Sequence, residues 1–235
     1  MDIEEYSKYM TAEMLMGPNS LRILEALFVK YPLALSTGDS VLDLGCGKGL
    51  TSFAIAKETC AKVYANDLWI SAEDNAKRFS EWGMSKQIIP VHEDANELNF
   101  EKGQFSALIS IDSYHYFATG KGFFEEKILP FLREKAVVLI GVPGIKDEFR
   151  GRSEELLSDW LGDESYMFQS PSAWKEIIGN HDRIDEVETW EMDCFEKAWD
   201  EWFTTEHKYA LGDKQFFNTL IKPYTCFVGI YIRLK

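Results

Sequence analysis

Three glycines that follow a short apolar run are the residues of this chain most suited to chemistry. Residues 41–44 read Val-Leu-Asp-Leu, which is typical of a buried strand, and Gly45, Gly47 and Gly49 follow at alternate positions. A strand that ends in glycines and leads into a helix lets its backbone approach a ligand with no side chain in the way. The pattern predicts a nucleotide-like cofactor at the end of this strand.

The spacing of the glycines and the charge of Asp43 distinguish two cofactor classes. A dinucleotide fingerprint has the spacing G-x-G-x-x-G, whereas Leu50 stands here where the third glycine would be. A carboxylate at Asp43 repels a pyrophosphate and favours a cationic group such as an α-ammonium. The segment therefore favours S-adenosylmethionine, which carries an ammonium and a sulfonium but no phosphate.

With these residues the chain resembles the class I S-adenosylmethionine-dependent methyltransferases of the bacterial small-molecule type, whose first motif is a strand with an acid followed by G-x-G-x-G. The resemblance is clear over roughly residues 36–145 and extends to the C-terminal strands by pattern. It implies that Asp43 lies near the methionine end of the cofactor, with the backbone of Gly45, Cys46 and Gly47 lining it. S-adenosylhomocysteine would be the product.

Two further acids stand at the ends of the next two predicted strands. Asp67 follows residues 62–66, and a carboxylate there can accept hydrogen bonds from both ribose hydroxyls; a helix cap or a surface carboxylate is the alternative. Asp94 follows the third strand, where the resemblance implies that it accepts from the adenine amino group while Ala95 offers its backbone amide. A turn-forming aspartate is the alternative for Asp94.

The segment after the fourth predicted strand matches the position of the motif that borders the transferred methyl group. His115 is the candidate proton acceptor, since its ordinary pKa suits work at neutral pH, and a packed structural histidine is the alternative. Tyr114 and Tyr116 are candidates for shaping the acceptor pocket or stacking on a cationic substrate. Tyr9, in a predicted N-terminal lid, is a third substrate-side candidate, with ordinary helix packing as its alternative.

The cofactor-binding residues expected from motif and resemblance together are Asp43, Gly45, Cys46, Gly47, Gly49, Asp67, Leu68, Asp94, Ala95 and Asp112.

Composition excludes several classes of partner. The chain has 25 basic and 39 acidic residues, a formal net charge of −14, so a phosphate backbone is repelled and nucleic acid is not expected. The acids gather after residue 147, which indicates a solvated face or a preference for a neutral or cationic substrate.

The four cysteines form no CxxC pair, so neither a metal site nor a disulfide framework is expected. No apolar run reaches the roughly 18 residues of a membrane span, and we expect a cytoplasmic protein, monomeric or homodimeric.

The elements that must position these residues alternate between strands and helices. Strands are predicted at residues 40–44, 62–66, 88–92, 105–111, 136–142, 183–192 and 225–234. Helices are predicted at residues 3–16, 19–30, 50–58, 71–82, 122–134, 171–178 and within 195–220, while residues 146–170 look polar and mobile. This predicts one α/β domain over residues 1–235, a Rossmann-like doubly wound sheet of seven strands, mostly parallel with an antiparallel last strand. A helical lid (1–35) precedes the cofactor-binding core (36–145), and substrate-side insertions, one of them helical before the last strand, follow (146–235).

The sequence therefore predicts transfer of a methyl group to a small molecule by in-line displacement, with the N, O or C acceptor atom left open. Two alternatives from other classes stay open. One is a non-catalytic S-adenosylmethionine-binding protein, because binding and turnover share these motifs. The other is a nicotinamide-dependent oxidoreductase, which Leu50 and Asp43 disfavour.

Overall fold

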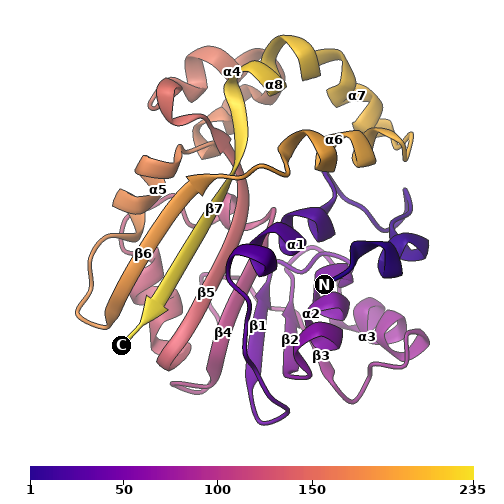
Figure 1. The fold of residues 1–235 in the computed structure, drawn as a ribbon, viewed down its shortest axis with the longest axis vertical. Coiled ribbons are helices and arrows are strands. Elements are labelled where there is room, and N and C mark those ends of the chain that lie inside the picture. Colours follow the sequence, from indigo (N-terminus) through magenta and orange to yellow (C-terminus); the bar gives the residue numbers. More distant parts are fainter.

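A single mixed sheet of seven strands forms the centre of the molecule, in the order β3-β2-β1-β4-β5-β7-β6 (Figure 1). The computed structural model describes all of residues 1–235. The strands are β1 (Ser40–Leu44), β2 (Lys62–Asn66), β3 (Ile88–Val91), β4 (Phe105–Ile111), β5 (Leu132–Ile145), β6 (Ile184–Glu191) and β7 (Thr225–Leu234). Strands β1 to β5 pair in parallel, and β7 runs antiparallel to both β5 and β6. The predicted seven-stranded sheet with an antiparallel last strand is confirmed.

Helices cover both faces of the sheet because its central strands are apolar on both sides. Every residue of β4 is buried. The helices are α1 (Ser20–Lys30), α2 (Leu50–Thr59), α3 (Ala72–Glu81), α4 (Ser153–Leu161), α5 (Pro171–Ile178), α6 (Phe195–Phe203), α7 (Lys208–Phe216) and α8 (Lys222–Tyr224). One hydrophobic core joins α1, α2, α3 and α6 to the sheet, and a second joins α5 to its other side. None of the helices is long and apolar enough to cross a membrane.

Three predicted segments differ from the structure. Only Ile3–Tyr9 of the predicted first helix is helical, as a 3₁₀ turn, and the chain then runs irregularly to Pro18. The predicted helix at 122–134 is a π turn (Phe124–Ile128) and a 3₁₀ turn, because Pro130 has no N–H to continue a helix and β5 begins at Leu132. Residues 146–170 contain α4 and two 3₁₀ turns, Asp147–Phe149 and Gly162–Met167, rather than a mobile loop.

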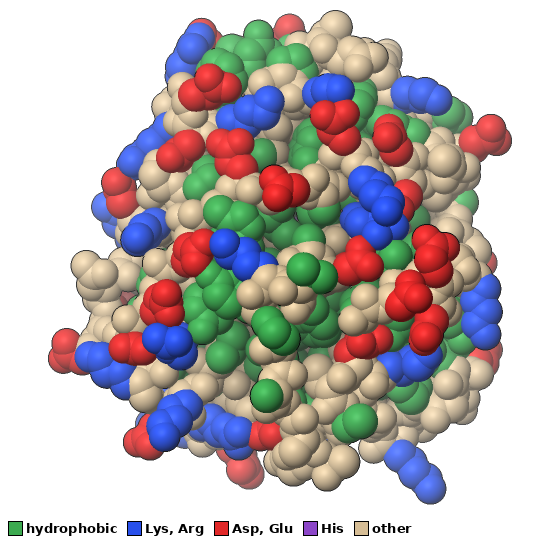
Figure 2. Space-filling view, viewed as in Figure 1, with side chains coloured by type: hydrophobic (Ala, Val, Ile, Leu, Met, Phe, Trp, Pro, Cys, Tyr) green, Lys and Arg blue, Asp and Glu red, His purple; other side chains and the backbone are tan.

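The helical insertion between β6 and β7 lies over the carboxyl ends of the parallel strands. Figure 1 shows α4 and the segment from α6 to α8 together at this end of the sheet. The predicted helical insertion before the last strand is therefore confirmed, and it reaches the edge where the predicted cofactor residues stand. On the face in Figure 2, basic side chains are interspersed with acidic ones and do not gather in one area.

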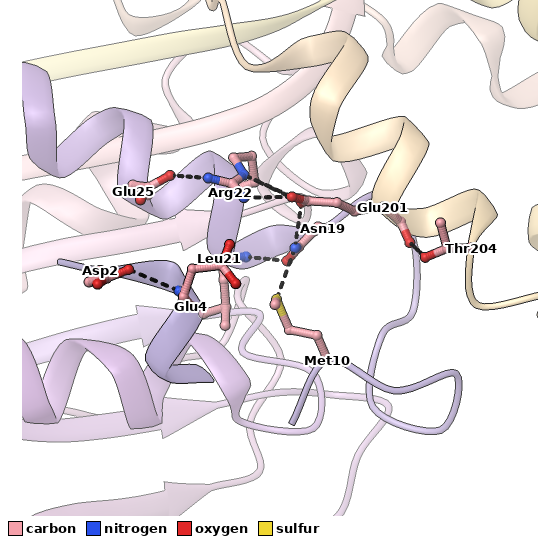
Figure 3. Close-up of polar contacts among 9 residues, drawn as sticks. All are labelled: Asp2, Glu4, Met10, Asn19, Leu21, Arg22, Glu25, Glu201 and Thr204. Carbon is pink, nitrogen blue, oxygen red and sulfur yellow. Dashed lines mark hydrogen bonds and ion pairs between the residues drawn. The ribbon is translucent and has the colours of Figure 1, made fainter. Parts of the chain in front are cut away.

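A partly buried ion pair connects this insertion to the N-terminal part of the chain (Figure 3). Arg22 of α1 is 7% exposed, and its Nη2 lies 2.5 Å from Oε1 of Glu201 in α6. Glu25 lies 2.5 Å from Arg22 Nη1. The Asn19 side-chain amide donates to Glu201 Oε2 at 2.7 Å, and the Asn19 N–H donates to the Ala198 carbonyl. Since breaking one side of a buried ion pair leaves the other charge uncompensated, these contacts hold α6 beside the loop that ends at Pro18.

Candidate active site

A cavity of about 410 Å³ opens at the carboxyl ends of β1, β2 and β4 and at the loop after β3. The strand order reverses between β1 and β4, and open α/β sheets bind their ligands at such a switch point. The volume is within the range of ligand cavities, roughly 300–1,000 Å³. Eight of the ten predicted cofactor residues line it, namely Gly45, Cys46, Gly47, Asp67, Leu68, Asp94, Ala95 and Asp112.

The glycine segment after β1 has the geometry that its sequence predicts. Gly45 has a φ of 76°, and a Cβ there would lie 2.0 Å from Ser113 Oγ, so only glycine fits. The backbone N–H groups of Gly45 and Cys46 both donate to the Asn66 carbonyl at the end of β2. The segment is thus held between β2 and the end of β4, with its exposed backbone on the cavity.

Asp67 holds this segment from the other side. Its carboxylate accepts hydrogen bonds from the backbone N–H groups of Gly47, Trp69 and Ile70, each at 2.8 Å, and the residue is 7% exposed. A carboxylate has about four acceptor positions, so about one is left for a ligand. The structure therefore supports contact with one ribose hydroxyl more readily than with two.

Asp94, Ala95 and Leu68 form the part of the wall that the sequence assigns to the adenosine. Asp94 accepts from the backbone N–H and the side-chain amide of Asn96, and these bonds lower its pKa. Asp94 is therefore a turn-forming aspartate and a cavity residue at once, and the two interpretations are compatible. Ala95 is buried, while Leu68 is half exposed at the rim.

Two predicted cofactor residues, Asp43 and Gly49, lie behind the cavity wall and do not line it. Asp43 is fully buried, and its Oδ2 accepts from Thr51 Oγ1 at 2.7 Å and Ser52 Oγ at 2.6 Å. Gly49 begins α2 at a φ of 82°, where a Cβ would lie 2.4 Å from the Phe79 ring. Both residues position the start of α2, one by hydrogen bonds and the other by close helix packing.

Burial of Asp43 makes a pH-dependent contribution to stability. Burial raises the pKa of Asp43 to about 6, and its Oδ1 has no hydrogen-bond partner. Because the folded-state pKa is above the unfolded one, the folded protein binds the extra proton, and stability is lost as pH rises from about 4 through about 6. Asp43→Asn should therefore have a larger free energy of unfolding than the wild type at about pH 8, by about 3 kcal/mol; denaturant unfolding measures the difference. The difference should shrink at about pH 4, and an equal difference at both pH values would contradict the shifted pKa.

A second, smaller cavity of about 160 Å³ adjoins the first. The two share five lining residues, which are Met16, Gly17, Pro18, Asp112 and Tyr116. The far wall comes from the insertions and includes Trp160, Phe168, Trp199 and Asp213. The sequence indicated the segments that contain these residues, but it gave no motif that singles out Trp160 or Asp213.

His115 lines the second cavity and not the first. It is 3% exposed, and burial lowers its pKa to about 3, so its imidazole is neutral at physiological pH. Its Nδ1 has no hydrogen-bond partner. The low pKa makes it a weaker base than the ordinary histidine that the sequence predicts, although it lies on the expected side of the site.

Of the three tyrosines predicted to contact the substrate, only Tyr116 lines a cavity, and it lines both. Tyr114 is buried and packs against Phe117, Phe123 and Trp174. The prediction for Tyr114 is corrected because its ring turns into the core.

Tyr9 packs edge-on against Phe53 and Trp82, with ring centroids 5.0 and 5.6 Å apart, and lines neither cavity. Burial of aromatic surface thus fixes this tyrosine on α2 and α3. Within the predicted lid segment, Met14 and the residues from Met16 to Pro18 line the first cavity.

Comparison with known proteins identifies a methyltransferase domain in this chain. Residues 41–128 match the family described as "Methyltransferase domain", which covers β1 to the π turn and with it the whole glycine segment. Residues 41–128 therefore form a methyltransferase domain, and this match supports the class I, S-adenosylmethionine-dependent family that the sequence resembles. A methyltransferase domain favours S-adenosylmethionine as the cofactor and disfavours a nicotinamide-dependent oxidoreductase.

Solved structures share the fold of this methyltransferase at low sequence identity. Geranyl diphosphate C-methyltransferase from Streptomyces coelicolor A3(2), solved with Mg²⁺, geranyl diphosphate and S-adenosylhomocysteine, is 14% identical with a TM-score of 0.72, over 89% of this chain and 78% of that one. A putative sarcosine dimethylglycine methyltransferase from Galdieria sulphuraria is 11% identical with a TM-score of 0.65, over 91% of this chain and 83% of that one. Phosphoethanolamine N-methyltransferase 2 from Haemonchus contortus is 18% identical with a TM-score of 0.69, over 94% of this chain and 54% of that one. No curated protein sequence matches this methyltransferase.

Proposed function

We propose that this enzyme binds S-adenosylmethionine in the 410 Å³ cavity and transfers its methyl group to a small-molecule acceptor in the adjoining 160 Å³ cavity. The observation that carries the proposal is the shared boundary of the two cavities. Asp112 and Tyr116 form part of both walls, so a group at the inner end of the first cavity lies beside the second.

The placement of the cofactor rests on the chemistry of the first cavity's wall. The backbone of Gly45, Cys46 and Gly47 would run along the methionine part. Leu50 and Thr51 of the first turn of α2 lie on the wall. The backbone N–H groups of this turn have no partner within the helix, so they can donate hydrogen bonds to the methionyl carboxylate. Asp67 would take the ribose. Asp94 and the Ala95 amide would take the adenine, with Leu68 at the rim.

The reaction asks the protein mainly to position the reactants. The sulfonium is a good leaving group, so the nucleophile must be held about 3 Å from the methyl carbon and in line with the C–S bond, with water excluded. Met16 and Pro18 close over both cavities and are placed to exclude water. Neutral His115 keeps a nitrogen lone pair on the acceptor side, where it can orient the nucleophile or accept its proton.

Calorimetric titration and thermal unfolding with S-adenosylmethionine, S-adenosylhomocysteine and NAD test the binding part of this proposal. The two adenosyl compounds should bind, and at a ligand concentration about 100 times Kd they should stabilise the fold by about 2.7 kcal/mol. NAD should leave the unfolding temperature unchanged, because Leu50 stands where a dinucleotide fingerprint has its third glycine. Stabilisation by NAD without stabilisation by S-adenosylhomocysteine would contradict the proposed site.

A further inference from the structure

The second cavity is lined by three acids and no lysine or arginine. Asp112 stands at its boundary with the first cavity, while Glu164 and Asp213 come from the far side. Asp112 receives no hydrogen bond from the protein, and burial together with nearby Asp213 raises its pKa to about 7. A carboxylate with no partner in a partly desolvated place is costly, so this end of the cavity favours a positively charged guest.

Two deeply buried polar groups on the same wall also lack a protein partner. Trp199 is 4% exposed and His115 is 3% exposed, and neither Trp199 Nε1 nor His115 Nδ1 has a hydrogen-bond partner. Both residues line the second cavity. Buried polar groups are normally hydrogen-bonded. The neutral His115 ring has one nitrogen that can accept a hydrogen bond from an ammonium, whereas Trp199 Nε1 can only donate and does not select a cation.

Aromatic rings occupy much of the remaining wall. Trp160, Phe168 and Tyr116 line the cavity together with Trp199. The Trp160 Nε1 donates to Asp213 Oδ1 at 3.0 Å, which fixes the indole ring beside this carboxylate. The faces of such rings attract cations. The acids and the aromatic rings therefore both favour a positively charged guest, and both disfavour a guest that carries a carboxylate or a phosphate.

The lid loop closes directly onto Asp112. A Cβ on Gly17 would lie 2.8 Å from Asp112 Oδ2, so only a glycine lets the loop approach the carboxylate this closely. The backbone of Asp112 has a φ of 55°, and its N–H donates to the Gly141 carbonyl at 2.7 Å. The carboxylate is thus held at the junction of the two cavities.

We propose that the acceptor of this methyltransferase is a small amine without a carboxylate or phosphate, bound in its cationic form by Asp112 between the aromatic rings of the second cavity. This inference rests on the proposed function, since it requires the cofactor in the first cavity. It changes the expected role of Asp112, which the sequence assigned to the cofactor.

The proton and electron balance of the reaction gives Asp112 a second task. An ammonium has no lone pair, so the bound amine first gives one proton to the Asp112 carboxylate. The neutral nitrogen then attacks the methyl carbon, the N–C bond forms as the C–S bond breaks, and the sulfonium becomes a neutral thioether. The products are a methylated ammonium and S-adenosylhomocysteine, and the proton on Asp112 passes to water. A carboxyl whose pKa is near neutrality suits such a transfer.

Matched acceptors test the substrate class. Tyramine and histamine differ from tyrosine and histidine only by the absent carboxylate, and ethanolamine and putrescine extend the set of amines. Formation of S-adenosylhomocysteine should be seen with at least one of the four amines and with neither amino acid. Turnover of no amine, or turnover only of amino acids, of alcohols, or of a diphosphate ester with Mg²⁺, would overturn the inference. If S-adenosylhomocysteine binds in those cases, the proposed function still stands; if it does not bind, the proposed function itself fails.

Variants test the role of Asp112. Asp112→Asn keeps the shape of the side chain, and asparagine tolerates the positive φ. It should raise KM for the amine at least about tenfold and lower kcat, while the Kd for S-adenosylhomocysteine stays within about twofold. Asp213→Asn should raise KM with less effect on kcat. Asp163→Asn removes the same charge at an exposed residue outside the cavity, so KM and kcat for the amine should both stay unchanged. Weakened S-adenosylhomocysteine binding in Asp112→Asn, or an unchanged KM, would contradict the assignment.

Discussion

Replacing Gly45 with alanine is expected to weaken the binding of S-adenosylhomocysteine by more than about 100-fold. The added Cβ would lie 2.0 Å from Ser113 Oγ and 2.4 Å from Ser113 Cβ. Ser113 cannot easily move away, because its Oγ donates to the Leu44 carbonyl at 2.8 Å and lies 2.9 Å from Ser110 Oγ. The glycine segment must shift instead, and it forms the wall of the cofactor cavity. Isothermal titration calorimetry of the folded variant measures the loss.

Gly83→Ala is the matched control for this experiment. Gly83 has a φ of 72°, close to the 76° of Gly45, but a Cβ there would meet nothing within 4 Å. Its cost should be the backbone strain alone, about 1 kcal/mol of unfolding free energy, with the Kd unchanged. If Gly45→Ala binds S-adenosylhomocysteine as well as Gly83→Ala does, the cofactor does not use the Gly45 wall and its proposed placement is wrong.

Asp67→Asn should weaken S-adenosylhomocysteine binding by about 100-fold and lower the unfolding free energy by about 2 kcal/mol. The carboxylate accepts three backbone N–H bonds, one of them from Gly47 in the glycine segment. The three N–H groups are shared between the two carboxylate oxygens, and asparagine has only one side-chain oxygen. At least one of these N–H groups therefore faces the NH₂ group of the asparagine and loses its acceptor. The glycine segment then loses its anchor as the ribose loses its acceptor. Calorimetry and denaturant unfolding measure the two effects separately.

Asp94→Asn is the comparison for Asp67. Asp94 lines the same cavity, yet its side chain accepts hydrogen bonds only from Asn96, two residues further along the same turn. An asparagine can keep that bond through its oxygen, so the Kd should change by about tenfold or less. A larger effect at Asp94 than at Asp67 would show that the two acids have exchanged roles, and the ribose would then have to be placed elsewhere.

Much of the cofactor side of the site could be predicted because its signals are local. A glycine that must adopt positive φ, or an acid directly after a strand, is visible within a few residues of sequence. Parallel strands then bring their carboxyl ends to one edge of the sheet, so Gly45, Asp67 and Asp94 meet without any need to know the packing. The same reasoning could not separate residues on the wall from those that support it. Asp43 and Gly49 have the expected types, but they lie beneath the segment.

The substrate side could not be predicted to the same degree. Tyr114 and Tyr116 stand two residues apart in a 3₁₀ turn, and only the path of that turn decides that Tyr114 enters the core while Tyr116 faces both cavities. Tyr9 had an equally plausible place in a lid, but the aromatic surface of Phe53 and Trp82 takes it. An aromatic side chain indicates that a residue will be buried, but it does not indicate which residues it will pack against.

The sequence by itself determined the seven-stranded fold, and it predicted the methyl donor and the edge of the sheet that we propose holds it. Each of these depends on periodicity or on residues adjacent in the chain. Only the tertiary structure decided which acids line the second cavity. Asp112 and Asp213 meet at the second cavity because the insertion before β7 folds back over the sheet, where Glu201 holds it to Arg22. Such a meeting depends on long-range packing, and no pattern within either segment records it.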